Sequence, residues 1–245
     1  MEPLIAAVGD VHSPKYLLEY ISALSRSADD CEAAEAFLWA GDMVLKGRVS
    51  ALRSVIDVTR KICGEKRIIA VFGNEEYIGT EYEYVKEYPE VEWLDDSYTT
   101  LRFDGIRVCV YGTRGALDRL TAWQRKHMPW LREIYRKRAL KAANALKELF
   151  KVCDYTILLS HYAPTYATLE GEPREIWPEL GSRLFEEKVL PHIGFGLAVH
   201  GHAHRSKKHV AFIPRTAMVV NVALPAVRRI TFIKFMPSEG EIAVY

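Results

Sequence analysis

Short apolar runs that end abruptly in polar residues recur along the chain. Continuous runs of this kind are typical of strands buried on both faces, so they predict a sheet sandwiched between other layers. The runs cover residues 4–8 before Gly9-Asp10, 37–40 before Gly41-Asp42, 68–72 before Gly73-Asn74, 156–159 before Ser160-His161, and 197–199 before His200-Gly201-His202.

Amphipathic helices are expected between these strands, at residues 15–25, 49–63 and 131–150. The dipeptide Asp104-Gly105 predicts a hairpin between strands at 99–103 and 106–111. Four further β-rich runs follow at 210–213, 218–222, 230–235 and 241–244. Alternating β and α segments followed by mostly β predict an α/β or α+β sandwich. In the longest helix, the predicted apolar stripe is Leu131, Ile134, Tyr135, Leu140, Ala143, Leu146 and Phe150.

The composition is that of an ordinary globular protein. The chain has 245 residues, with 49% hydrophobic and 27% charged residues, which predicts a single domain over 1–245. A net charge of +1 provides no global attraction to nucleic acid or to an anionic membrane. No stretch approaches the ~20 apolar residues that cross a bilayer, and residues 1–14 show no basic leader.

The four cysteines are far apart in the sequence and form no CxxC motif. Cys31, Cys63, Cys109 and Cys153 are therefore expected to be small, buried, unpaired side chains. Unpaired cysteines are typical of a reducing compartment, so we expect a cytoplasmic protein.

Potential metal ligands stand at the ends of the five predicted strands. Ligands bind at the carboxyl ends of strands in open α/β sheets, so these five ends can converge on one crevice. Seven groups are more than one ion takes, whereas two ions that share a bridging carboxylate would use them. Imidazole, carboxylate and amide donors suit Mn²⁺, Fe or Zn²⁺. The seven groups are Asp10, His12, Asp42, Asn74, His161, His202 and His204.

The ordered blocks GDVH, GD, GN, SH and GHAH, spanning residues 9–204, resemble the five-block signature of the calcineurin-like metallophosphoesterase superfamily. The resemblance implies a four-layer αββα sandwich in which the β-rich C-terminal part belongs to the second sheet. It also implies two metal ions that activate water for in-line attack on phosphorus. By the same resemblance, the first ion is held by Asp10, His12, Asp42 and His204, and the second by Asp42, Asn74, His161 and His202, with Asp42 bridging.

The third block departs from the pattern of many family members, in which GNH precedes an acidic residue. That histidine is thought to assist the leaving group, and Glu75 stands in its place in Gly73-Asn74-Glu75-Glu76. An ionised carboxylate repels a phosphate, so Glu75 either points away or is protonated and acts as an acid. We therefore expect activated or diester substrates to be preferred. The catalytic candidates are Asp42, Asn74 and Glu75.

Other residues beside the strand ends have two interpretations each. Asn74 and Arg114 are candidates for substrate binding, although Arg114 could equally be a surface or capping arginine. His200 is expected to pack beside the site or support it rather than bind metal. The basic segment 125–151 is a solvated helix face or a track for polyanions. The acidic, tyrosine-rich segment 75–92 could form a wall of the pocket, and the loop 162–181 could shape substrate choice or a subunit contact.

Taken together, these features predict a phosphodiesterase or phosphatase for small molecules, with two divalent ions and Mn²⁺ favoured. A nuclease is one alternative, which the neutral charge and the acidic segment disfavour. A metal-binding scaffold that docks partner proteins without catalysis is another. We expect a small phosphoester as substrate, neither nucleic acid nor a membrane as partner, and leave a homo-oligomer open.

Overall fold

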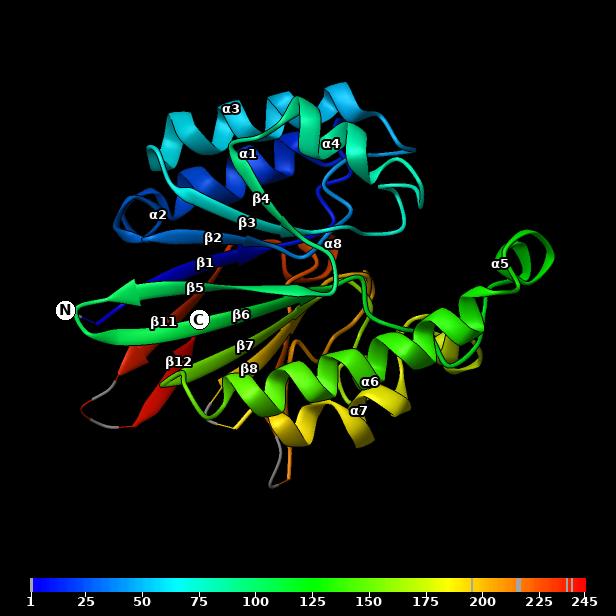
Figure 1. Ribbon diagram of the computed structural model, residues 1–245. Helices are drawn as coiled ribbons and strands as arrows, with labels where there is room; N and C mark the ends of the chain where they lie inside the picture. Colours follow the sequence, from blue (N-terminus) through cyan, green and yellow to red (C-terminus); the bar gives the residue numbers. More distant parts are fainter. Residues whose placement is uncertain (1, 195, 215–216, 237, 239) are drawn as a thin grey trace.

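Two mixed β-sheets lie face to face in the computed structural model, which describes residues 2–194, 196–214, 217–236, 238 and 240–245 (Figure 1). The order of the first sheet is β12 (Glu241–Val244), β11 (Thr231–Met236), β1 (Leu4–Val8), β2 (Ala36–Trp39), β3 (Arg67–Val71) and β4 (Val91–Leu94). This sheet contains four parallel strands, and beyond β1 it continues with β11, antiparallel to β1, and β12, antiparallel to β11.

The second sheet has four parallel strands between antiparallel edge strands. Its order is β5 (Ser97–Phe103), β6 (Ile106–Thr113), β7 (Tyr155–Ser160), β8 (Gly196–His200), β10 (Ala217–Asn221) and β9 (Val210–Ile213). The expectation that the whole C-terminal β-rich part joins this sheet was wrong. β9 and β10 do so, but β11 pairs with β1 and β12 with β11, because the edge of β1 away from β2 needs backbone partners.

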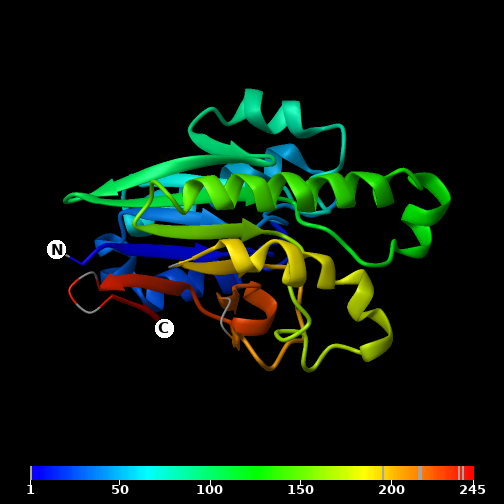
Figure 2. The same ribbon diagram turned by 60° about the horizontal axis from the view of Figure 1, so that its bottom comes forward.

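Helices cover the outer face of each sheet and complete the predicted four-layer αββα sandwich (Figure 1). The first sheet is covered by α1 (Leu17–Arg26), α2 (Ala28–Ala33), the 3₁₀ turn Val49–Ala51, α3 (Leu52–Cys63) and α4 (Glu81–Glu87). The second is covered by α6 (Leu131–Leu149) and α7 (Arg183–Lys188). Short α5 (Ala122–His127) lies beyond the end of α6, away from both sheets (Figures 1 and 2). The remaining short elements are the 3₁₀ turns Arg174–Glu179 and Leu190–His192, and α8 (Leu224–Val227).

Strand β1 shows why the parallel strands are continuous apolar runs. Leu4, Ala6 and Val8 pack in the layer between the first sheet and its helices. Ile5 and Ala7 point the other way, into the layer between the two sheets. Successive side chains of a strand alternate between faces, so a strand covered on both faces must be apolar at every position.

The predicted apolar stripe of α6 was wrong at three positions. Ile134, Leu140 and Phe150 are 38%, 62% and 48% exposed. The buried face uses small residues, Ala139 and Ala142, because their short side chains allow the helix to approach the sheet closely. The full buried face is Leu131, Tyr135, Ala139, Ala142, Leu146 and Leu149.

The expectation of unpaired cysteines was also wrong. Cys31 of α2 is bonded to Cys63 at the end of α3, and Cys109 of β6 is bonded to Cys153. The partners are 32 and 44 residues apart in sequence, a separation that only the packing of the elements closes. The cytoplasmic location rested on unpaired cysteines, and it stays a prediction without that support. Among the described residues, no helix is both long and apolar enough to span a bilayer.

Candidate metal centre

The predicted ligands lie at the carboxyl ends of strands from both sheets. Asp10 and His12 follow β1, Asp42 follows β2, and Asn74 follows β3 in the first sheet. In the second sheet, His161 follows β7, and His202 and His204 follow β8. Backbone hydrogen bonds join the turns: the Asp10 N–H donates to the Gly41 carbonyl at 2.9 Å, and the His12 N–H to the Asp42 carbonyl at 2.9 Å.

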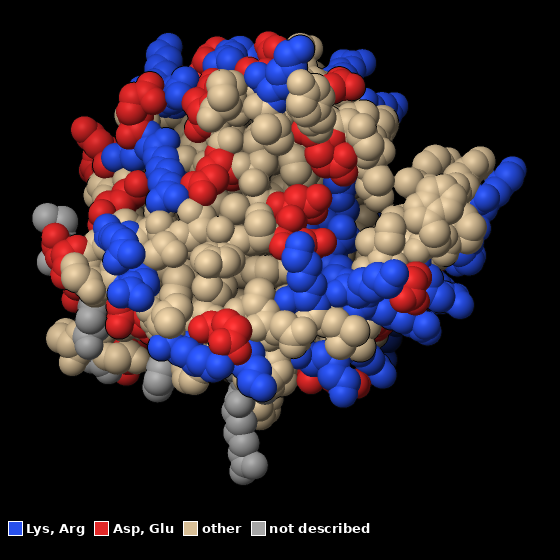
Figure 3. Space-filling view, in the orientation of Figure 1, with Lys and Arg blue, Asp and Glu red and all other residues tan. Residues whose placement is uncertain are grey.

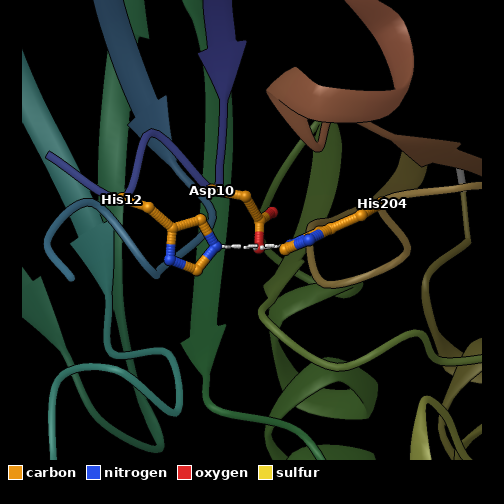
Figure 4. Close-up of side chains that lie close together, drawn as sticks. All are labelled: Asp10, His12 and His204. Atoms are coloured by element: carbon orange, nitrogen blue, oxygen red, sulfur yellow. Dashed lines mark hydrogen bonds and ion pairs between the residues drawn. The ribbon is translucent and has the colours of Figure 1, made fainter. Parts of the chain in front are cut away.

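Asp10, His12 and His204 form the first cluster, in which one possible ligand atom from each lies within 4.8 Å of the others. His204 Nε2 is 2.8 Å from Asp10 Oδ1 and 3.3 Å from His12 Nε2 (Figure 4). The three side chains therefore turn their donor atoms toward a common point.

Asp42, His161 and His202 form the second cluster, again with ligand atoms within 4.8 Å of one another. Asn74 adjoins it, with Oδ1 3.0 Å from His161 Nε2. Asp42 Oδ2 is 3.5 Å from His161 Nε2 in this cluster and 3.7 Å from His12 Nε2 in the other. The structure thus brings the seven predicted residues together, and the carboxylate predicted to bridge lies between the two clusters.

Four of these residues have a positive backbone φ angle, which residues other than glycine rarely adopt. Asp10, His12, Asp42 and His202 have φ of 60°, 45°, 53° and 67°. Such left-handed conformations are costly outside glycine and tend to occur at functional sites. Gly41, at φ 83°, is needed for a further reason, since a Cβ there would lie 2.7 Å from Gly73 N. The turns are therefore shaped to aim the ligands.

Glu76 is a residue of the site that the sequence reasoning missed. Its buried carboxylate accepts the backbone N–H groups of Asp42 at 2.8 Å and Gly73 at 2.7 Å, and also those of Met43 and Val44. Burial and the charge of Asp42 raise the pKa of Glu76 to about 7, against the lowering effect of these hydrogen bonds. The available signal was the second acidic residue of Gly73-Asn74-Glu75-Glu76. Glu76 fastens the turn after β2 to the turn after β3.

The electrostatics of the two clusters suit cations. Burial and the charge of Asp10 raise the pKa of Asp42 to about 7. Burial would also raise the pKa of Asp10, but His204 and His12 bring it well below its usual range. Burial lowers the pKa of His161 and His202, so both imidazoles stay neutral, as ligands must be. Burial also acts to lower the pKa of His12 and His204 in the first cluster, but Asp10 and Asp42 outweigh it and raise the pKa of both, so the carboxylates favour positive charge there. Buried carboxylates and imidazoles are a donor set that fits divalent ions.

Glu75, at the unusual position of the third block, is tied to the turn after β2. Its side chain accepts the backbone N–H of Lys46, and its own N–H donates to Asp42 Oδ1 at 2.7 Å. The Glu75 carboxylate is thus held by the neighbouring loop. Its catalytic role stays a prediction.

Arg114 is buried, at 2% exposure, so it is not a surface arginine. Its guanidinium donates to the carbonyls of Gly73 and Glu76 and pairs with Glu81 at 2.8 Å. These contacts hold the loop after β3. Contact with substrate stays a prediction for this side chain.

His200 is buried beside the site, with Nε2 2.8 Å from Thr168 Oγ1. Burial lowers the pKa of its imidazole to about 4. This agrees with the packing role predicted for it.

The fold and the two clusters define an α/β protein with a candidate dinuclear metal site. A family model described as calcineurin-like phosphoesterase matches residues 3–206, and the chain belongs to this family. Comparison with curated proteins finds no match.

Solved structures confirm the fold. GAP50, the anchor in the inner membrane complex of Plasmodium, is 10% identical with a TM-score of 0.60, and the match covers 95% of this chain and 81% of that one. TT1561 of Thermus thermophilus is 15% identical with a TM-score of 0.59, over 100% and 99% of the two chains. A 5'-nucleotidase precursor from Thermus thermophilus is 16% identical with a TM-score of 0.58, over 100% of this chain and 54% of that one.

Proposed function

We propose that the protein is a metal-dependent phosphodiesterase that acts on small phosphoesters. The position of Asp42 carries this proposal, since Oδ2 lies 3.7 Å from a nitrogen of one cluster and 3.5 Å from a nitrogen of the other. When bound, two divalent ions activate water and neutralise charge on the phosphate oxygens. The mixed nitrogen and oxygen donors favour Mn²⁺, with Fe or Zn²⁺ also compatible.

The residues around the clusters have separate tasks in this proposal. Asn74 Oδ1 faces His161, which leaves the amide N–H groups able to donate to a phosphate oxygen. Arg114 and Glu76 hold the backbone on which Asn74 and Asp42 stand. The carboxylate of Glu75 repels a doubly charged monoester more than a singly charged diester, which supports the preference for diesters.

A nuclease is the second candidate, because lysines and arginines gather over α6 (Figure 3). Several of these charges already have acidic partners: Arg138 pairs with Asp96 at 3.0 Å, and Lys137 lies 4.0 Å from Glu133. A small phosphoester is therefore better supported as the substrate than a nucleic acid. Binding of a nucleic acid would weaken steeply as salt rises, so the salt dependence of hydrolysis separates the two.

The test is hydrolysis of bis(p-nitrophenyl) phosphate and p-nitrophenyl phosphate by metal-free protein with and without added Mn²⁺. We expect Mn²⁺-dependent cleavage, faster for the diester, which is lost in Asp42→Asn. Asp57→Asn, at an exposed position of α3, is the matched control and should keep full activity. Preference for the monoester would overturn the diester assignment. Metal binding without any hydrolysis would favour the scaffold alternative.

A further inference from the structure

A cavity of about 650 Å³ opens directly beside the second cluster. Asn74 and His202 line its metal end. Its other walls come from the loop after β3, through Tyr77 and Ile78, and from the segment around α5, through Trp123 and Met128. A substrate whose phosphorus lies at the clusters can therefore place an adjoining group in this cavity.

Several polar side chains that line the cavity away from its metal end are already engaged by other protein groups. Arg114 donates to backbone carbonyls and pairs with Glu81. Gln124 completes the capping box of α5 with Thr121. Glu179 accepts from Arg119 at 3.0 Å. The surface left for a ligand is chiefly apolar and aromatic, which suits neither a sugar nor a polyanion.

The walls are held in place before any ligand arrives. The Thr121 capping box fixes the start of α5, and Gln124 Nε2 also donates to Tyr135 Oη at 3.3 Å, which ties this helix to α6. On the opposite wall the Tyr77 ring packs on Gly47, where a Cβ would lie 2.8 Å from Tyr77 Cδ2. Preformed walls reduce the entropy lost when a ligand binds.

Two of the wall residues expose large aromatic surfaces. Trp123 is 61% exposed and Tyr77 is 46% exposed, so both side chains have solvent-accessible surface that a bound ligand can bury. Tyr162 adds a third ring at the metal end, with its centroid 4.9 Å from that of His202. Aromatic rings pack edge-to-face or offset against other rings and gain energy beyond the buried area.

We infer that this cavity selects phosphoesters that carry a planar aromatic group next to the phosphorus. The inference rests on the proposed phosphodiesterase function, because it takes the clusters as the place where the phosphate binds. It adds the chemical class of the substrate, which the metal ligands alone do not determine.

The test uses phosphonates, whose P–C bond is not hydrolysed, at a pH where all the compounds are dianions, so that repulsion by Glu75 is the same for each. Binding of phenylphosphonate, cyclohexylphosphonate and methylphosphonate to the Mn²⁺-loaded protein is measured by calorimetry. We expect phenylphosphonate to bind about ten-fold more tightly than methylphosphonate, with cyclohexylphosphonate between them, because a ring is buried and packs on rings. Trp123→Ala should remove most of this preference without changing the affinity for methylphosphonate, and Trp123→Phe should restore it.

Trp130→Ala is the matched control, since Trp130 is also exposed on this segment but does not line the cavity. It should leave the preference unchanged. Equal binding of phenyl- and methylphosphonate, equal binding of the phenyl and cyclohexyl compounds, or a preference that survives Trp123→Ala would each overturn the inference. Diester hydrolysis is measured on the same samples. A protein that prefers phenylphosphonate but hydrolyses nothing would overturn the proposed function and leave the inference standing.

Discussion

The carboxylate of Glu76 accepts the backbone N–H of Asp42 at 2.8 Å and thereby orients the residue that lies between the two metal clusters. The same carboxylate accepts three further backbone N–H groups from the turns after β2 and β3. The geometry of the site thus depends on Glu76, a buried acid that is not one of the seven predicted metal ligands.

Replacing Glu76 with Gln should weaken both the fold and the metal site. The new amide N–H₂ would face backbone N–H donors, so at least one donor loses its partner, at a cost of about 1–3 kcal/mol in the free energy of unfolding. We expect weaker Mn²⁺ binding as well, since the turn that carries Asp42 is no longer held. Urea denaturation of metal-free protein and calorimetry measure the two effects. Glu83→Gln, on the exposed face of α4, should change neither. Unchanged stability and Mn²⁺ affinity in Glu76→Gln would contradict this role.

The two clusters should each hold one Mn²⁺, with Asp42 serving both. Removal of His204 from the first cluster or His161 from the second, each by substitution with Ala, should leave about one ion per chain. Asp42→Asn should weaken the binding of both ions, because the Asp42 carboxylate lies between the clusters. Metal content after desalting, measured by mass spectrometry, distinguishes these outcomes. His127→Ala, an exposed histidine outside the clusters, is the control. A single ion in the unaltered protein would refute the dinuclear assignment.

Glu75→His should shift the substrate profile toward monoesters with poor leaving groups. The substitution removes a negative charge near the substrate phosphate and adds a group able to protonate the leaving oxygen. The comparison is kcat/KM for an alkyl monoester against bis(p-nitrophenyl) phosphate. Glu75→Gln controls for loss of the charge, because its carbonyl can still accept the Lys46 N–H. If the ratio for Glu75→His equals that of the unaltered protein, Glu75 has no part in substrate preference.

Both disulfides should contribute to stability. Replacing Cys31 and Cys63 together by Ser should lower the free energy of unfolding by about 3 kcal/mol, because the bond restricts the unfolded chain. Urea denaturation measures this loss. Thiol titration of the denatured but unreduced protein should find no reactive cysteine among the four, since all are paired. Four reactive thiols would instead restore the expectation of unpaired cysteines and the argument for a reducing compartment.

Much of the metal site could be predicted from sequence, because each ligand is marked by the short stretch of sequence around it. Each ligand directly follows a strand, and parallel strands end at the same edge of a sheet, so Asp10, Asp42 and Asn74 had to lie near one another. His202 and His204 both follow β8, although they belong to different clusters. The bounds of β1, β9 and β12 matched the predicted strands as well.

The sequence by itself determined most of the strands, the helices at 15–25, 49–63 and 131–150, and the identity of the candidate ligands, since these follow from short-range patterns of residue type. It did not predict β4 or short helices such as α4 and α7. Only the tertiary structure decided which sheet β11 joins, which cysteines pair, and that Glu76 binds the turns after β2 and β3. It alone also placed Trp123 and Tyr77 around one cavity. These features depend on distances between segments far apart in the chain, and those distances are set by the packing of the layers rather than by any local pattern.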